Sequence, residues 1–200
     1  MQISGLILAG GASKRFGRPK ALIELAGRPL ILYVAEAMES LVDETVVSVA
    51  DSEMGVRIRS ILPQAVFARD GRPDSGPIEG FRQGFRAARG DFVLVAPCDA
   101  PLLQPNLYRL LIGVLGDHDA AVPRFDVLDP VRAVYRRTPV LQVLAASPSV
   151  TSPSALVDNL NAVFVGPDRI CTVDSTLASF LDVNTRADLD EVLRRMQSTN

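Results

Sequence analysis

Short apolar runs alternate with segments of helical periodicity along most of this chain, and this rhythm restricts the possible folds more than any other feature. Residues 3–8 (ISGLIL) predict a buried strand, because the run is short and apolar and is followed by Gly10-Gly11. Further strands are expected at residues 45–50, 65–68 and 92–96, and helices at residues 30–41, 54–61, 77–88 and 105–115. Such alternation predicts an α/β fold, a mostly parallel sheet with helices on both faces.

The second half follows the pattern less regularly. Strands are expected at 120–123 and 131–135, a helix at 139–146, a surface loop at 147–154 and a last short strand at 181–183. Asn184-Thr185 is expected to cap a final helix, in which Thr185 and Asp188 form a variant of the capping box. The loop is too short for a domain linker, so we expect a single domain.

Composition excludes several classes of function. The 200 residues fit one domain, and 21 Lys plus Arg against 23 Asp plus Glu give a net charge of −2, without the basic field that nucleic-acid binding requires. One histidine excludes multi-histidine metal sites. Cys98 and Cys171 cannot form a disulfide framework and favour a reducing compartment. Since no run approaches the roughly 20 apolar residues of a membrane-spanning helix, and no targeting segment is evident, we expect a cytoplasmic protein without a membrane partner.

The most informative segment is the glycine-containing loop after the first strand, residues 8–20 (LAGGASKRFGRPK). Glycines at this position let the backbone approach a ligand closely, and ligands of open α/β sheets bind at the carboxyl ends of the strands. Three cations, Lys14, Arg15 and Lys20, lie in this loop of a slightly acidic protein and favour an anionic ligand. The loop matches neither a Walker loop nor the three-glycine dinucleotide motif. A glycine turn with solvated charges is the alternative.

The whole pattern LAGGxSxRxGxxK resembles the opening of the molybdenum cofactor guanylyltransferases, which are Rossmann-like nucleotidyltransferases. The resemblance continues at residues 75–80 (SGPIEG), 97–101 (PCDAP) and 182–185 (DVNT), in the family's order and over nearly the full chain. It implies a three-layer α/β/α fold in a single domain, residues 1–200. Nucleotide binding would fall to residues 1–105 or so, and acceptor binding to residues 106–200.

The resemblance also implies a reaction. GMP would be transferred from GTP to the phosphate of molybdopterin (the molybdenum cofactor), with release of pyrophosphate and with Mg²⁺, or alternatively Mn²⁺, as the metal. The acceptor phosphate is already ionised at neutral pH, so no strong general base is required, which suits a chain with one histidine. Proteins that deliver or receive the cofactor are conceivable partners. Alternatives are cytidylyl transfer, transfer to a sugar phosphate or cobinamide phosphate, and a nucleotide-binding regulator without activity.

Lys20, Arg15 and Asp99 are the expected catalytic residues. Asp99 follows a central strand, and a carboxylate among bound phosphates is a suitable oxygen ligand for Mg²⁺. The family's Asn-x-Asn-Thr motif adds Asn184 as a second metal ligand, although Asp182 replaces the first Asn of that motif. Lys20 and Arg15 would neutralise the triphosphate. A turn-capping Asp99 and a helix-capping Asn184 are the structural alternatives.

Nucleotide binding is assigned by resemblance to Leu8, Ala9, Gly10, Gly11, Ser13, Lys20, Asp51, Asp70, Gly76, Pro77 and Asp99. Guanine presents N–H donors and requires an acceptor, either a carboxylate, for which Asp70 or Asp74 is the candidate, or backbone carbonyls. Asp51 ends the second strand, where relatives often carry Asn, and turn formation is its alternative role.

Acceptor binding is expected in the second half of the chain. A phosphate favours basic groups and a pterin favours a flat apolar surface, which directs attention to Arg124 and Tyr135, and also to Arg132 and Arg136. Cys98 is expected to be a small buried residue and His118 to have no catalytic role.

Overall fold

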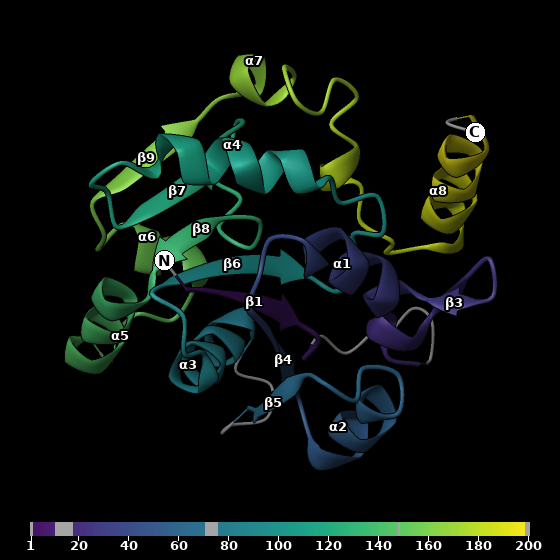
Figure 1. Cartoon of the computed structure of the whole chain (residues 1–200), viewed down its shortest axis with the longest axis horizontal. Helices are drawn as coiled ribbons and strands as arrows, with labels where there is room; N and C mark the ends of the chain where they lie inside the picture. Colours follow the sequence, from purple (N-terminus) through teal and green to yellow (C-terminus); the bar gives the residue numbers. More distant parts are fainter. Residues whose placement is uncertain (1, 11–17, 71–75, 148, 199–200) are drawn as a thin grey trace.

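The structure is a computed structural model that describes residues 2–10, 18–70, 76–147 and 149–198 (Figure 1). Within these residues, the main sheet has seven strands, which lie in the order β5 (Val66–Arg69), β4 (Glu44–Val49), β1 (Ile3–Leu8), β6 (Phe92–Pro97), β8 (Val134–Arg136), β7 (Ala120–Pro123) and β9 (Ala162–Val165). Strands β5, β4, β1 and β6 are parallel, β8 is antiparallel to both β6 and β7, and β9 is parallel to β7. The expected mostly parallel sheet is confirmed.

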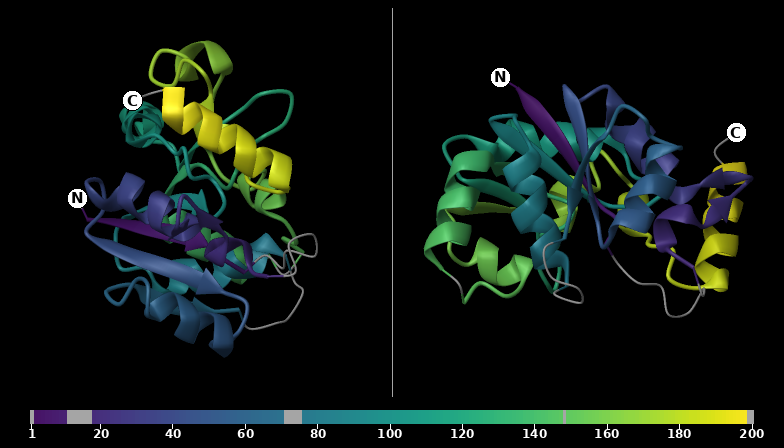
Figure 2. Two further views of the ribbon diagram at one scale, coloured as in Figure 1. Left: turned by 90° about the vertical axis from the view of Figure 1, so that its right-hand side faces the viewer. Right: turned by 90° about the horizontal axis from the view of Figure 1, so that it is seen from below.

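Helices cover both faces of this sheet (Figures 1 and 2). The described chain forms α1 (Leu30–Glu39), α2 (Ser52–Arg59), α3 (Pro77–Ala87), α4 (Pro105–Leu115), α5 (Arg137–Ala146), α6 (Pro153–Val157), α7 (Pro167–Ile170) and α8 (Arg186–Ser198), with the 3-10 turns η1 (Lys20–Leu22) and η2 (Ala178–Phe180). Buried residues of α1 and α4 form one cluster with the sheet, and those of α3, α5 and α6 form another on the opposite face. The three-layer α/β/α arrangement is therefore confirmed.

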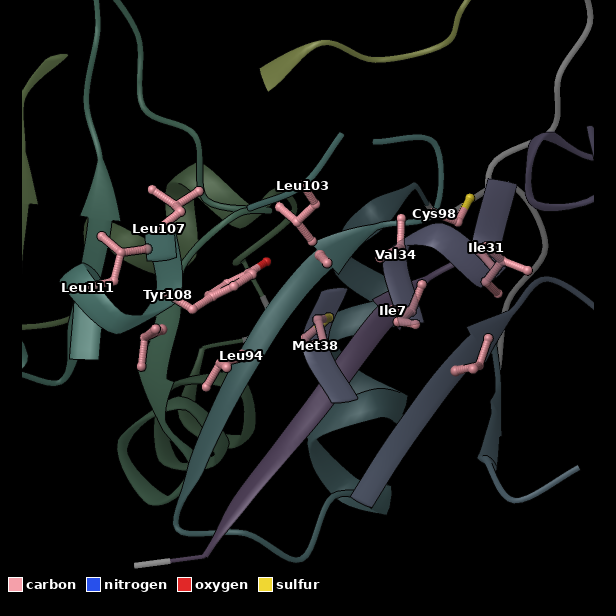
Figure 3. Packing of buried hydrophobic residues seen from close by; sticks show 14 of the residues in the cluster. Ile7, Ile31, Val34, Met38, Leu94, Cys98, Leu103, Leu107, Tyr108 and Leu111 are labelled. Carbon is pink, nitrogen blue, oxygen red and sulfur yellow. The ribbon is translucent and has the colours of Figure 1, made fainter. Parts of the chain in front are cut away.

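Alternation along β1 divides its side chains between the two layers. Ile7 belongs to the cluster under α1 and α4, whereas Leu6 belongs to the cluster under α3. Figure 3 shows Val34 and Met38 of α1 beside Ile7, and Tyr108 of α4 beside Leu94. The buried Tyr108 hydroxyl donates to the Val95 carbonyl at 2.6 Å, so the one polar atom of this side chain is satisfied.

A third, smaller cluster lies at one end of the molecule. The short strands β2 (Glu24–Leu25) and β3 (Arg28–Pro29) form an antiparallel pair, and α8 lies beside them in Figure 1 and in the right-hand view of Figure 2. Ile23, Leu30 and Val192 meet in the buried part of this cluster. The last helix is thus held against the segment that follows the glycine-containing loop.

The structure corrects two sequence expectations. Residues 181–183 do not form a strand: Val183 N–H donates to the Asp99 carbonyl, in the turn after β6, and Leu181 and Val183 pack in the third cluster. Residues 147–154 are not simply a surface loop, because Val150 is buried and α6 begins at Pro153, where the Ser152 side chain caps the helix.

Strand β9 was not expected from sequence. It is a run of four apolar residues in the edge strand of the sheet, with Phe164 44% exposed, and a run this short cannot be assigned to a strand by periodicity alone. Among the described residues, no helix is long and apolar enough to cross a membrane.

Candidate active site

The carboxyl ends of four parallel strands lie at one edge of the sheet. Gly10, Asp51, Asp70 and Asp99 follow β1, β4, β5 and β6, respectively, by one or two residues. Backbone hydrogen bonds continue beyond the strands: Ala9 N–H donates to the Ser48 carbonyl, and Asp70 N–H donates to the Val49 carbonyl. The edge therefore gathers residues from widely separated parts of the sequence, as expected for a ligand site in an open α/β sheet.

Lys20 lies at the centre of this edge and contacts two predicted metal ligands. Its ammonium donates to the Asp99 carboxylate at 2.6 Å and to the side-chain oxygen of Asn184 at 2.5 Å. The backbone holds the same residues together, because Val183 N–H donates to the Asp99 carbonyl at 2.9 Å. Three motifs from the start, middle and end of the chain thus meet at one point.

The donor set at this point fits a small divalent cation. The Asp99 carboxylate and the Asn184 amide oxygen already converge on one cation, the ammonium of Lys20. Both are hard oxygen ligands, and Mg²⁺ usually takes only one or two protein groups, with phosphates and water completing its shell. Among the described residues, no three His, Cys, Asp or Glu side chains gather as a metal-binding cluster, so such an ion would depend on a bound phosphate for further ligands.

Asn184 is not the residue that caps the last helix. Thr185 Oγ1 accepts from Asp188 N–H, and the Asp188 carboxylate accepts from the backbone N–H groups of Thr185 and Asn184. The expected capping box between Thr185 and Asp188 is confirmed. Because Thr185 performs the capping, the Asn184 side chain is directed to Lys20 instead.

A buried ion-pair network lies next to this cluster. Arg132 is 3% exposed and pairs with Asp129 at 2.7 Å and with Asp182. Burial raises the pKa of Asp182 to about 6, an effect that Arg132 opposes and that Asp99 reinforces. The charge of Asp182, which replaces the first Asn of the motif, is thus balanced by the guanidinium of Arg132, from the loop before β8.

A second group of predicted residues surrounds Gly10. A Cβ atom added to Gly10 would lie 2.7 Å from Oδ2 of Asp70, so only glycine allows this carboxylate so close to the backbone. Ser48 Oγ donates to the other carboxylate oxygen at 2.9 Å. Burial raises the pKa of Asp70 above its ordinary value; the Ser48 hydrogen bond opposes the shift and the charge of Glu79 adds to it.

Gly76 and Pro77 open α3 at the same edge. Gly76 has φ +71°, a conformation that glycine adopts without strain, and Pro77 occupies the first turn of the helix. Close packing also brings α3 onto β4, since a Cβ atom on Gly80 would lie 2.8 Å from Ser48 Oγ. The Gly-Pro motif thus sets the start of a helix that abuts the Asp70 group.

Asp51 has a structural role. Its side chain accepts a hydrogen bond from Met54 N–H at 2.8 Å and caps α2, and the residue is exposed. The alternative of a turn-forming Asp51 is the one that this geometry favours. Leu8 ends β1, and Ala9 lies between it and Gly10, as expected for the first residues of the loop.

Several predicted residues lie outside the described part of the chain. They are Gly11, Ser13, Lys14, Arg15, Asp74 and Ser75.

The structure separates the four acceptor candidates. Tyr135 is fully buried: its hydroxyl donates to the Pro130 carbonyl and its ring packs edge-on against Phe81, which leaves no surface for a ligand. Arg136 ends β8 at the opposite edge of the sheet, where it donates to the His118 and Gly116 carbonyls. This geometry does not favour Tyr135 or Arg136 as acceptor contacts.

The other two candidates differ from each other. The guanidinium of Arg132 is occupied by its contacts in the buried network described above. Arg124 is exposed at the carboxyl end of β7, which is parallel to β6, and lies over the Phe164 ring at 5.3 Å. Arg124 therefore remains the candidate that faces solvent at the proper edge of the sheet.

The structure also describes Cys98 and His118. Cys98 is buried, and burial, together with the charge of Asp99, raises the pKa of its thiol well above the usual range. The His118 ring nitrogen Nδ1 contacts the Leu115 carbonyl at the end of α4, which is a structural contact.

Sequence reasoning missed Ser48, the partner of Asp70. A signal existed, because a serine that is 1% exposed interrupts the apolar strand β4 and, once buried, requires a hydrogen-bond partner. The pairing of Arg132 with Asp182 was also missed, although each residue had been singled out for another reason.

Comparisons with known proteins agree with this geometry. Residues 5–163 match the family model described as the MobA-like NTP transferase domain. The chain is 30% identical to a probable molybdenum cofactor guanylyltransferase of Methanosarcina acetivorans, over 95% of this chain and 89% of the relative. It is 31% identical to a protein of the same name from Natronomonas pharaonis, over 96% and 98% of the two chains.

Among solved structures, the molybdopterin-guanine dinucleotide biosynthesis protein A of Archaeoglobus fulgidus superposes with a TM-score of 0.82. The two chains are 25% identical, and the match covers 98% of this chain and 99% of the other.

Proposed function

The chain belongs to the MobA-like NTP transferase family, and from this membership we propose that it transfers GMP from GTP to the phosphate of the molybdenum cofactor. The products are the guanine dinucleotide form of the cofactor and pyrophosphate. Relatives named as molybdenum cofactor guanylyltransferases match nearly the whole chain, which supports both the nucleotide and the acceptor.

One observation carries the proposal: Lys20, Asp99 and Asn184 meet at the carboxyl edge of the sheet, beside Gly10. Attack at an α-phosphorus increases the negative charge on the phosphate oxygens. A lysine at that edge would stabilise this charge once its ammonium contacts the triphosphate instead of Asp99. The acceptor phosphate is itself the nucleophile and is already ionised, so the remaining work is positioning and charge neutralisation.

Asp99 and Asn184 would hold a divalent metal, for which we propose Mg²⁺, with Mn²⁺ as a substitute. The metal, when bound, supplies neutralisation of triphosphate charge. With a metal on Asp99, the Lys20 ammonium would be free to contact the triphosphate, for which Arg15 is a second candidate cation.

Asp70 and Gly10 would receive the nucleoside. The Asp70 carboxylate is oriented by Ser48 and lies against the backbone at Gly10. The N–H groups of guanine require an acceptor, for which a carboxylate is suitable, and we assign this contact to Asp70. The nucleotide-binding part would comprise residues 1–105 or so and the acceptor-binding part residues 106–200, where Arg124 would contact the acceptor phosphate.

We place the reaction in the cytoplasm, where the free thiols of Cys98 and Cys171 stay reduced.

The direct test is pyrophosphate release. The purified protein is mixed with Mg²⁺, molybdenum cofactor and each of GTP, CTP, ATP and UTP in turn. Release with GTP, dependent on the cofactor, is expected. Release with CTP alone would overturn the choice of nucleotide, and the absence of release with every nucleotide would overturn the enzymatic assignment.

A further inference from the structure

We propose that Arg132 is a positioning residue for the metal-binding and triphosphate-binding group, because it holds residues 179–182 so that Asn184 lies beside Asp99 and Lys20. The inference rests on the proposed function, in which Asn184 and Asp99 hold a metal. It gives Arg132 a role different from the acceptor contact expected from sequence.

The guanidinium of Arg132 is fully engaged within the protein. Nε donates to the Ser179 carbonyl at 2.7 Å, Nη1 donates to Asp129 at 2.7 Å, and Nη2 donates to Asp182. The guanidinium also lies 5.5 Å from the centre of the Phe180 ring. With 3% exposure and all three nitrogens donating, Arg132 has no surface with which to bind a substrate phosphate.

Three of these contacts, with Ser179, Phe180 and Asp182, fall on the segment that leads to Asn184. Ser179 is fully buried, and its hydroxyl accepts from Gln104 N–H at the start of α4. Asp182 lies two residues before Asn184, and between them Val183 N–H donates to the Asp99 carbonyl. Arg132 therefore ties the loop before β8 to both ends of a short irregular segment, and that segment delivers Asn184 to the site.

A role in position differs from a role in charge, and the two predict opposite results. If Arg132 acted by its charge alone, its removal would leave Asp129 and Asp182 uncompensated, and the added negative potential would strengthen cation binding nearby. If Arg132 positions Asn184, its removal frees the segment and weakens metal binding, because partners of metal ligands fix ligand orientation. The sign of the change in metal affinity separates the two.

The experiment measures Mn²⁺ binding by electron paramagnetic resonance, with a non-hydrolysable GTP analogue present. Arg132→Met is expected to weaken Mn²⁺ binding by about tenfold, and Arg132→Lys, which keeps the charge without the planar fork, by a smaller factor. Arg82→Met is the matched control. Arg82 is likewise an arginine whose guanidinium donates within the protein, to the backbone carbonyls of Leu144 and Val150, but on the other face of the sheet. The Arg82→Met variant should have a lower melting temperature and an unchanged Mn²⁺ affinity.

A second pair of variants keeps the test valid if Arg132→Met does not fold. Asp182→Asn and Asp182→Leu remove the same charge, but only Asn keeps an oxygen that accepts from Arg132. Weaker Mn²⁺ binding in Asp182→Leu than in Asp182→Asn supports the inference, and equal binding in the two contradicts it.

The outcomes also separate this inference from the proposed function. Unchanged or tighter Mn²⁺ binding in Arg132→Met, in a background where the unmodified protein binds Mn²⁺ and releases pyrophosphate, overturns the inference alone. An unmodified protein that neither binds Mn²⁺ with the analogue nor releases pyrophosphate overturns the proposed function and the inference with it.

Discussion

The ammonium of Lys20 lies 2.6 Å from the carboxylate of Asp99, and the two side chains are 23% and 10% exposed. The residues are 79 positions apart in the sequence, and each belongs to a different motif. Lys20 therefore neutralises the carboxylate that a metal would require. This relationship leads to the first two predictions.

Asp99→Asn should reduce pyrophosphate release by about a hundredfold or more, because the variant keeps an oxygen in place and loses the charge that a divalent cation needs. The measurement is a continuous pyrophosphate assay with GTP, Mg²⁺ and the cofactor. Circular dichroism should show an intact fold. Activity close to that of the unmodified protein would contradict the metal assignment.

Lys20→Met should bind Mn²⁺ more tightly than the unmodified protein in the absence of nucleotide. The reason is competition: Lys20 occupies the same two oxygens, on Asp99 and Asn184, that a cation would use. A gain of about tenfold is expected, which corresponds to roughly 1.4 kcal/mol. With the GTP analogue present, the variant should bind Mn²⁺ more weakly than the unmodified protein, because the triphosphate of the analogue has lost its contact with the Lys20 ammonium. Unchanged Mn²⁺ affinity without nucleotide would show that Lys20 does not compete.

How much of this site could be predicted from sequence depends on the kind of signal. The strand ends were predictable, because apolar runs followed at once by Gly10, Asp70 or Asp99 place those residues at one edge of a parallel sheet. The choice between a capping and a site role for Asn184 was not. Asn184 and Thr185 are both good caps, and only the three-dimensional path shows that Thr185 performs the capping.

The contact between Arg132 and Asp182 was beyond sequence reasoning for a different reason. The residues are 50 positions apart, and both lie in irregular segments. Ion pairs in such segments leave no periodic pattern, in contrast to the pairs at helical spacing within α8. Tyr135 illustrates the opposite error: an aromatic residue suits a pterin surface, but here its ring fills the core under α3.

Asp70→Asn should change how stability depends on pH. Because burial raises the pKa of Asp70, the folded protein retains a proton there at pH values where the unfolded chain has released it. The free energy of unfolding contributed by this group therefore falls as pH rises from about 4 through the folded-state pKa. Asn does not titrate, so the stability of the variant does not fall with pH for this reason. Its melting temperature relative to that of the unmodified protein should rise between pH 4 and pH 7, and a constant or falling difference would contradict the prediction.

Gly10→Ala should impair nucleotide binding, because its Cβ atom would lie 2.7 Å from the Asp70 carboxylate and would displace it. A loss of GTP affinity of about tenfold or more is expected in a calorimetric titration. Gly113→Ala, in α4, is the control: a Cβ atom there meets no atom within 4 Å. That variant should be more stable by about 0.5–1 kcal/mol and should bind GTP normally. Normal GTP binding by Gly10→Ala would show that the approach of Asp70 to the backbone is not required.

Arg124→Met and Tyr135→Phe together test where the acceptor binds. Arg124 is exposed over the Phe164 ring, and Met preserves apolar packing while it removes the charge. The KM for the cofactor should therefore rise by about tenfold, the factor for one lost charge-assisted contact of roughly 1.4 kcal/mol, with little change in stability.

Tyr135→Phe should instead lower stability and leave cofactor binding unchanged, because the variant leaves the Pro130 carbonyl without its donor in the core. The free energy of unfolding should fall by about 1–3 kcal/mol while the KM for the cofactor stays the same. Denaturant titration and initial rates at varied cofactor concentration measure the two effects. A KM that rises in Tyr135→Phe and not in Arg124→Met would return the acceptor to the β8 region, and would require the core around Tyr135 to open during the reaction.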